Sequence, residues 1–241
     1  MVLKCDLHIH SCLSPCGSLS MSPSAIARIA SEKGLDVIAI ADHNIALNAP
    51  AFEAACRKYG ITSLFGVEVT TSEEFHALCL FQKSGEAVSF GNMLYENLQS
   101  RSNKPEKFGD QVYVDEYENI LGEVDKYLSG GAVSYSSDQL LKMVHLSNGL
   151  FIPAHIDRAA FSISSQLGFI PPDDYDALEI TTYPPILNTE NTPLISNSDA
   201  HYPDDIGKRY FFLECNSRKP EHIFKAIKEG KTTPSIKKIT K

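Results

Sequence analysis

The sequence lacks the segments that direct a chain into or across a membrane. None of its apolar runs approaches the roughly 20 residues of a membrane-spanning helix. Its first residues lack a basic stretch followed by an apolar one, so we expect no secretory signal. Six cysteines are scattered along the chain, most of them among apolar neighbours. Without an export signal, we expect a cytoplasmic protein with reduced thiols and no membrane partner.

The sequence also lacks an excess of basic residues. Lys and Arg number 22 against 30 Asp and Glu, which gives a formal net charge of −8. This balance disfavours a broad nucleic-acid surface, because phosphate contacts need Lys and Arg. Aromatic residues interleaved with basic ones are sparse as well, so nucleic acid is a possible but less favoured partner. An acidic site filled with metal cations is compatible with this charge.

The chain alternates between short apolar runs and helical patterns. Helices are predicted at residues 21–34, with Ser22 as N-cap, and at 48–60 and 220–230. Strands are predicted at residues 2–10, 35–42, 62–71, 76–81, 149–155, 177–182, 193–201 and 210–216. Strands alternating with helices are typical of parallel β/α units, and this number of them predicts a closed or nearly closed barrel.

Residues 84–148 interrupt this alternation. The region is polar and contains no evident core of its own. We predict helices at residues 116–128 and 136–149, on either side of a turn at Gly130 and Gly131. We therefore interpret residues 84–148 as a helical insertion between two strands of a single domain that spans residues 1–241.

Six of the eight histidines lie at the ends or starts of predicted strands. In the opening DLHIH motif, Asp6, His8 and His10 alternate along a strand and should share one face, which alone fits either a polar strand face or a metal site. Because the strand ends of a β/α barrel meet at one face, these side chains should converge. Imidazole and carboxylate suit Zn, Mn or Fe, and the donors are too many for one ion. The candidate metal-binding residues are His8, His10, His43, Glu68, His76, His155, Asp199 and His201. His145 and His222 are interpreted as ordinary helix-face histidines.

The motifs DLHIH, IADHN, GVEV, HALCL, PAHIDR and SDAH, in this order, resemble the PHP (polymerase and histidinol phosphatase) family. The resemblance spans Asp6 to His201. It implies an α/β fold, a distorted (β/α)7 TIM-like barrel, with two or three divalent transition-metal ions and phosphoester hydrolysis. The family includes histidinol-phosphate phosphatases, nucleases, nucleotide phosphatases and domains of bacterial DNA polymerases.

The resemblance also implies a distribution of ligands among three metals. His8, His10, Glu68 and Asp199 would hold the first, Glu68 would bridge to a second with His76 and His155, and His43 and His201 would hold the third. The chain departs from the family pattern at SCLSPCG, where a further third-metal ligand is usual. Pro15 and Cys16 stand there. Cys16 either binds a metal as a thiolate or is a packed thiol, and the sequence leaves both open.

Three residues other than the ligands have two open roles each. Asp42 and Asp6 either orient a metal-binding histidine or are structural hydrogen-bonding partners. Arg158 either grips a substrate phosphate or forms a surface ion pair with Asp157 or Asp173.

The predicted function is hydrolysis of a phosphomonoester or small nucleotide by metal-activated water, with Glu68, Asp42 and Arg158 as candidate catalytic residues. An exonuclease acting on DNA or RNA ends and a non-catalytic metal-binding regulatory module are the alternatives. The sequence does not indicate the oligomeric state.

Overall fold

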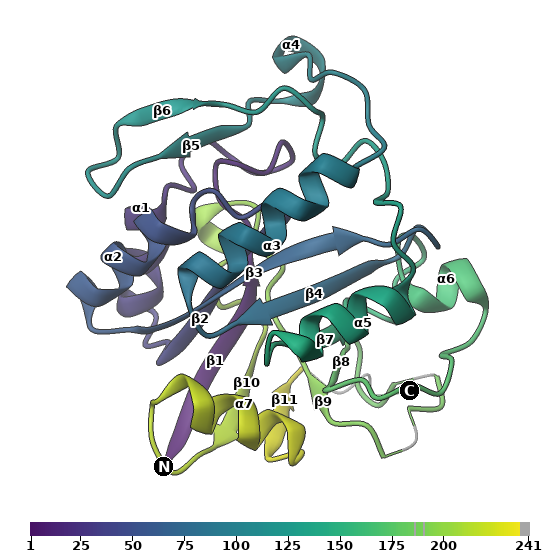
Figure 1. Ribbon diagram of the computed structural model, residues 1–241. Helices are drawn as coiled ribbons and strands as arrows, with labels where there is room; N and C mark the ends of the chain where they lie inside the picture. The colour runs from purple at the N-terminus through teal and green to yellow at the C-terminus, as the bar shows by residue number, and fades with distance from the viewer. Residues whose placement is uncertain (186, 190, 237–241) are drawn as a thin grey trace.

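The computed structural model describes residues 1–185, 187–189 and 191–236, and a curled seven-stranded sheet forms its centre (Figure 1). The strand order is β11-β10-β1-β2-β3-β4-β7. The strands are β1 (Val2–Ile9), β2 (Val37–His43), β3 (Thr62–Thr70), β4 (His76–Phe81), β7 (Leu150–Pro153), β10 (Tyr210–Glu214) and β11 (Thr232–Ser235). The expected α/β class and distorted barrel are thus confirmed.

Within the seven-stranded sheet, the expected parallel pairing is found only among β1, β2 and β3. β1 pairs with β2, and β2 with β3, in parallel. The pairs β3–β4, β4–β7, β1–β10 and β10–β11 are antiparallel. Residues 71–75, which join β3 to β4, are too few for the crossover that a parallel pair requires. The sheet is therefore mixed.

Two apolar layers enclose the sheet. The outer face packs against the helices α1 (Pro23–Glu32), α2 (Ala49–Tyr59), α3 (Ser84–Asn97) and α5 (Ser137–Leu146). In Figure 1, α3 and α5 lie across β3, β4 and β7, so the two ends of the 84–148 region cover the sheet. The inner face packs against α7 (Pro220–Lys228) and the short parallel pair β8 (Leu178–Glu179) and β9 (Leu194–Ile195).

Local signals fix the helix ends near the predicted places. The Ser22 hydroxyl accepts a hydrogen bond from the Ala25 N–H at 3.3 Å, as expected of an N-cap. α2 ends at Gly60, whose φ of 67° is the left-handed conformation that glycine adopts without strain. The sequence patterns did not predict α3, β11, α4 (Pro105–Phe108), α6 (Ile163–Leu167) or the 3₁₀ turn Pro203–Asp205.

The predicted helix at residues 116–128 is wrong. This segment contains β6 (Ile120–Glu123), which forms a hairpin with β5 (Val112–Val114). The Asp115 carboxylate accepts the N–H groups of Tyr117 and Asn119, each at 2.9 Å. Such side-chain turns compete with helix formation, and here they close the hairpin instead. The strands expected at 177–182 and 193–201 also shrink, to β8 and β9.

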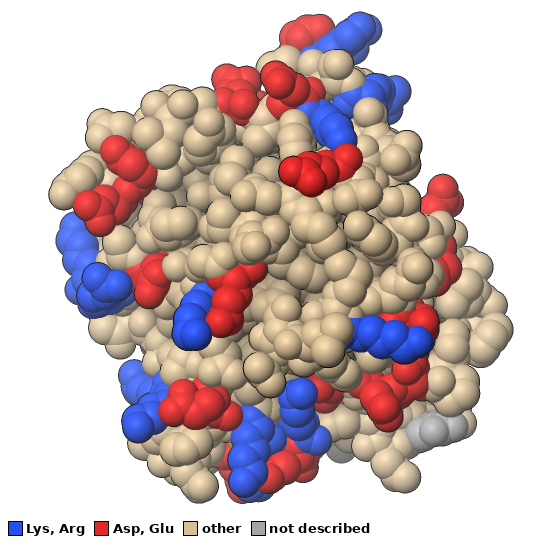
Figure 2. Space-filling view, viewed as in Figure 1, with Lys and Arg blue, Asp and Glu red and all other residues tan. Residues whose placement is uncertain are grey.

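The surface carries mixed charge on the face shown in Figure 2. Basic and acidic side chains alternate around its edge and form no continuous basic area there. Pairs such as Arg28–Glu32, at 2.7 Å, neutralise one another locally. None of the described helices is long and apolar enough to cross a membrane. All six cysteines are unpaired, as expected.

Candidate metal centre

On the inner face of the sheet, apolar side chains give way to histidine and carboxylate side chains at one end of the strands. Side chains two residues apart on a strand share a face, so Val37, Ala39 and Ala41 of β2 are followed by His43. On β3, Leu64 precedes Glu68 on the same face, and Glu68 is the direct neighbour of His43 across the parallel pair. His76 begins the antiparallel β4 and therefore lies at this same edge.

A β-bulge in β1 brings His8 and His10 to the inner face. The register with β2 shifts between Asp6 and Ile9. Before the shift the odd residues, such as Leu7, join the inner apolar layer, and after it Ile9 joins the outer one. Bulges re-aim side chains in this way. The expectation that Asp6, His8 and His10 share one face is therefore wrong for Asp6.

Glu68 is the centre of the cluster. Its side chain is 1 % exposed, and its two oxygens contact five histidines. Three ring nitrogens approach Oε1: His76 Nδ1 at 2.9 Å, His155 Nε2 at 3.1 Å and His8 Nε2 at 3.3 Å. Two approach Oε2: His43 Nδ1 at 3.0 Å and His10 Nε2 at 3.4 Å. A carboxylate so surrounded is placed to bridge two cations.

Asp199 is a second carboxylate beside His8 and His10. Its Oδ1 lies 3.3 Å from His8 Nε2 and 3.1 Å from His10 Nε2. His201 Nδ1–H donates to the Asp199 backbone carbonyl, 2.9 Å away, and its ring stacks on that of His10. Asp199 has a φ of 52°, and left-handed backbone at a non-glycine residue is typical of functional sites.

The donor arrangement fits metal ions better than a hydrogen-bond network. The Nε2 atoms of His8 and His10 face each other at 3.2 Å, and His43 Nδ1 is buried without a hydrogen-bond partner although Glu68 is near. Nitrogens and carboxylate oxygens that converge in this way suit divalent transition metals. Three groups bring their donors within 4.8 Å of one another: His8–His10–Glu68, His43–Glu68–His76 and His10–His43–His201.

These groups overlap more than the family resemblance implies. His10 belongs to two of them, and His43 lies with Glu68 and His76 as well as with His201. The structure thus brings together all eight histidine and carboxylate residues that the sequence singled out.

The cluster electrostatically favours an ionised Glu68. Burial alone would raise the pKa of this carboxyl, but the neighbouring His76, His8 and His43 outweigh burial and hold the pKa well below its usual range. Burial likewise opposes ionisation of Asp199, and His8 and His10 lower its pKa. Both carboxylates are therefore ready to bind cations at neutral pH.

Glu179 is a supporting residue that the sequence analysis missed. Its buried carboxylate lies 3.1 Å from His8 Nδ1 and accepts the backbone N–H of His155 at 2.9 Å. Asn197 donates to the other oxygen at 3.1 Å. Hydrogen bonding at Nδ1 leaves His8 Nε2 free for a metal. A carboxylate inside the otherwise apolar run ALEI was the available signal.

We predict that Glu179→Gln weakens metal binding by about 10–100-fold, the usual cost of losing such a supporting carboxylate. The amide would no longer hold the His8 tautomer by a charge-assisted hydrogen bond. Isothermal titration with Zn²⁺ or Mn²⁺ measures the effect. Glu214→Gln, an exposed residue of β10, is the matched control and should bind as the wild type does. Equal affinity in both variants would contradict the assigned role.

Asp42 and Asp6 act at a distance from the cluster. Asp42 accepts hydrogen bonds from the Ser11 backbone and from the Ser11 and Ser14 hydroxyls, at 2.6–2.7 Å. Ser14 in turn contacts His10 Nδ1 at 2.9 Å, so Asp42 orients this histidine through a serine. Asp6 accepts the N–H groups of Ser198 and Gly207 and thereby fixes the turn that carries Asp199.

Cys16 lies beside the His10–His43–His201 group. The residue is exposed, and His43 and His201 are near enough to influence the charge of its thiol. Burial of the thiol would raise its pKa, and these histidines lower it to about 6. In contrast, burial raises the pKa of Cys12 to about 12. These effects make Cys16 a better candidate for a thiolate ligand than Cys12.

We predict that iodoacetamide labels Cys16 alone in metal-free protein at pH 7, because only a thiolate reacts readily and the other thiols are buried. If Cys16 is a ligand, loading with Zn²⁺ slows this labelling several-fold. Peptide mass spectrometry identifies the labelled residue. A labelling rate that does not change on metal loading would instead show a thiol that binds no metal.

Arg158 contacts the metal cluster rather than the surface acids considered from the sequence. Its Nη1 lies 2.6 Å from Asp199 Oδ2, and 38 % of the side chain is exposed. The Asp157 carboxylate is instead bonded to the backbone and hydroxyls of Thr181 and Thr182. The ion pair expected as the alternative thus has a different partner. The Arg158 guanidinium lies beside the cluster.

The two remaining histidines lie outside the cluster. His145 Nε2 is 2.9 Å from Asp176 on the outer side of β7, and His222 contacts the Ser217 hydroxyl near α7. Both have local structural partners, in agreement with their interpretation as helix-face histidines.

Comparisons with known proteins agree with this geometry. The sequence model of the PHP domain matches residues 6–165, and one described as PHP-associated matches residues 186–232. A stretch of 79 residues is 30% identical to an uncharacterized protein of Methanocaldococcus jannaschii, and the match covers 30% of this chain and 46% of that protein. The chain thus corresponds to less than half of that relative.

Three solved structures share the fold. The lesion-specific endonuclease PfuEndoQ from Pyrococcus furiosus superimposes with a TM-score of 0.68 at 21% identity, over 97% of this chain and 58% of that one. Endonuclease Q in complex with a 27-mer duplex gives 0.64 at 22% identity, over 95% and 57%. A two-domain protein from Bacteroides vulgatus, which contains a predicted PHP-like metal-dependent phosphoesterase, gives 0.61 at 17% identity, over 98% and 65%. From the matched motifs and the clustered donors, the chain belongs to the PHP domain family.

Proposed function

We propose that the protein is a metal-dependent phosphoesterase that hydrolyses a phosphomonoester or a small nucleotide. The observation that carries this proposal is Glu68, one buried carboxylate whose oxygens contact five histidines at 2.9–3.4 Å. No simple structural role explains so many convergent donors around one carboxylate. The family membership of the chain supports the same chemistry.

Two or three divalent ions are proposed to occupy the cluster. Residues proposed as ligands are His8, His10, His43, Glu68, His76, His155, Asp199, His201 and Cys16. Histidine, carboxylate and one thiolate suit Zn, Fe or Mn, and a thiolate favours Zn or Fe. When bound, such ions lower the pKa of a coordinated water and offset the charge on phosphate oxygens.

The protein's own residues orient the ligands and the substrate. Glu179 holds the His8 ring, and Asp42 holds the His10 ring through Ser14. Glu68 keeps the ligand set together and is proposed to bridge two ions. Arg158 is placed to pair with a non-bridging phosphate oxygen by exchanging its contact with Asp199, since a guanidinium matches phosphate geometry.

A substrate panel tests this proposal. Metal-loaded protein is assayed against p-nitrophenyl phosphate, nucleoside mono- and bisphosphates, and a short end-labelled oligonucleotide. We expect turnover of the small phosphoesters, and loss of that turnover in His8→Ala. A protein that binds metal and turns over no member of the panel would support the non-catalytic regulatory alternative.

A nuclease is the second candidate. The fold similarity to endonuclease Q, including its complex with duplex DNA, favours it. The net charge of −8 weighs against a broad basic surface, and the face in Figure 2 shows no continuous basic area. Cleavage of the labelled oligonucleotide faster than of any mononucleotide would establish the nuclease instead.

A further inference from the structure

An exposed phenylalanine borders the metal centre. Phe161 is 51% exposed, and its ring stacks on that of His76 with centroids 5.0 Å apart and planes inclined by 15°. His76 is itself 2.9 Å from Glu68. His76 stacks on one side of the Phe161 ring. The exposed part of the ring is therefore available to a second flat group beside the cluster.

The backbone holds this ring in place against its own preference. Phe161 has a φ of 53°, a left-handed conformation that is strained for a bulky residue. Its carbonyl accepts the His76 N–H at 2.9 Å. The next residue, Ser162, is buried and donates its hydroxyl to the Arg158 carbonyl at 2.6 Å. Strain that the surroundings enforce beside a site is typical of a functional constraint.

One short segment presents three kinds of group to the site. His155 Nε2 contacts Glu68 at 3.1 Å, Arg158 contacts Asp199 at 2.6 Å, and Phe161 stacks on His76. The Arg158 guanidinium and the Phe161 ring therefore both lie beside residues of the cluster. This pairing suits a ligand in which a phosphate lies near a flat aromatic group.

We propose that Phe161 is a specificity residue, an aromatic platform that favours phosphoesters carrying a flat aromatic group such as a nucleobase. The inference rests on the proposed phosphoesterase function and adds the shape of the substrate. An aromatic side chain stacks on any base, because every base has a π face. The platform therefore selects for a base without selecting which one.

Calorimetric binding to metal-loaded protein tests the platform with a matched pair of probes. Adenosine 5′-monophosphate and ribose 5-phosphate, each used as its non-hydrolysable methylenephosphonate so that turnover does not consume it, share the sugar phosphate and differ by the base. We expect the nucleotide to bind about 10-fold more tightly, within the range of one base–aromatic stack. In Phe161→Ala and Phe161→Asn this ratio falls to about 1, whereas ribose 5-phosphate affinity and metal content do not change. Phe161→Tyr keeps the ratio.

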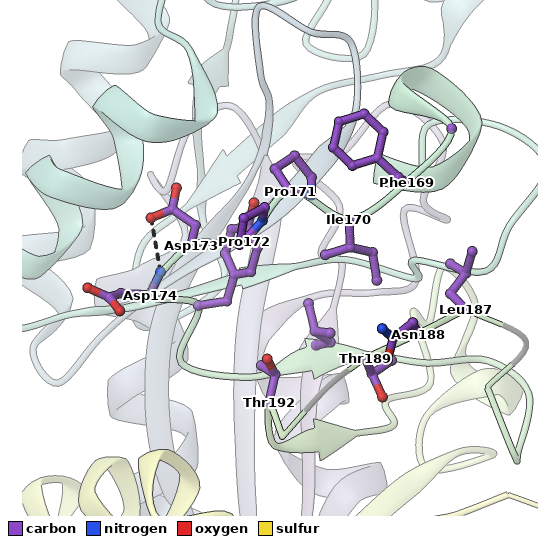
Figure 3. A pocket seen from close by; sticks show the side chains of 13 residues that line it. Phe169, Ile170, Pro171, Pro172, Asp173, Asp174, Leu187, Asn188, Thr189 and Thr192 are labelled. Carbon is purple, nitrogen blue, oxygen red and sulfur yellow. Dashed lines mark hydrogen bonds between the residues drawn. The ribbon is translucent and has the colours of Figure 1, made fainter.

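Two control variants separate this role from a structural one. Asn tolerates left-handed backbone, so Phe161→Asn should unfold at no lower temperature than the wild type. Phe169→Ala removes an aromatic side chain that is 59% exposed on the same connection and lines a separate cavity between residues 168 and 192 (Figure 3). We expect this second variant to keep the wild-type ratio.

The possible results also separate the platform from the proposed function. An unchanged ratio in Phe161→Ala, a parallel loss of both affinities with loss of metal, or a loss of the ratio in Phe169→Ala would each overturn the platform. If phosphoesters are hydrolysed nonetheless, only the platform fails. If neither probe binds and no phosphoester is hydrolysed, both fail. A dinucleotide assayed beside the mononucleotide shows whether the stacked base belongs to a free nucleotide or to a nucleic-acid strand. Hydrolysis of the preferred substrate falls more in Phe161→Ala.

Discussion

Glu68→Gln should abolish metal binding and lower kcat/KM for phosphoester hydrolysis by about 10³-fold or more. The change keeps the shape of the side chain but removes the charge that five histidines surround. An uncharged amide cannot bridge two cations, and metal ions contribute several kcal/mol to such reactions. Each 1.36 kcal/mol corresponds to a factor of ten in rate.

Metal analysis by mass spectrometry and an assay with p-nitrophenyl phosphate measure both effects of Glu68→Gln. Glu123→Gln is the matched control, because Glu123 is an exposed carboxylate on β6. Far-ultraviolet circular dichroism establishes that both variants are folded. Full metal content and full activity in folded Glu68→Gln would contradict the assigned role of the carboxylate.

Removal of metal should inactivate the protein and lower its unfolding temperature by about 10 °C. A ligand present at 1,000 times its Kd stabilises the folded state by about 4 kcal/mol. For a chain of this size, each kcal/mol shifts the midpoint by about 2–4 °C. Without cations, His43 Nδ1 is also buried without a hydrogen-bond partner, which destabilises the folded state.

Dialysis against a chelator, followed by calorimetry and assay, measures this loss. Adding back Zn²⁺, Mn²⁺ or Fe²⁺ separately should restore both stability and activity, and the most effective ion indicates the native one. An unfolding temperature that neither falls on chelation nor rises on reloading would show that no metal belongs to the folded state.

The convergence of the candidate ligands could be predicted from the sequence because their signal is local. Each of these residues lies at one end of an apolar run. The strand ends on one side of a sheet lie close together whether the strands are parallel or antiparallel. This explains why His76, at the start of the antiparallel β4, still reaches Glu68. The error about strand direction therefore did not affect the site.

The residues that support the ligands could not be predicted in the same way. The bulge that turns His8 inward and Asp6 away depends on pairing with β2, which periodicity does not show. Glu179 reaches His8 across 171 residues of sequence, and Asp42 reaches His10 only through Ser14. The hairpin at β5 and β6 replaced a predicted helix because Asp115 closes a turn by its side chain.

Anomalous diffraction from crystals of the metal-loaded protein, recorded at the absorption edge of the added metal, tests the central claim most directly. The account predicts at least two peaks that share Glu68, one beside His8 and His10 and one beside His76. Peaks elsewhere on the surface with none beside Glu68 would contradict it.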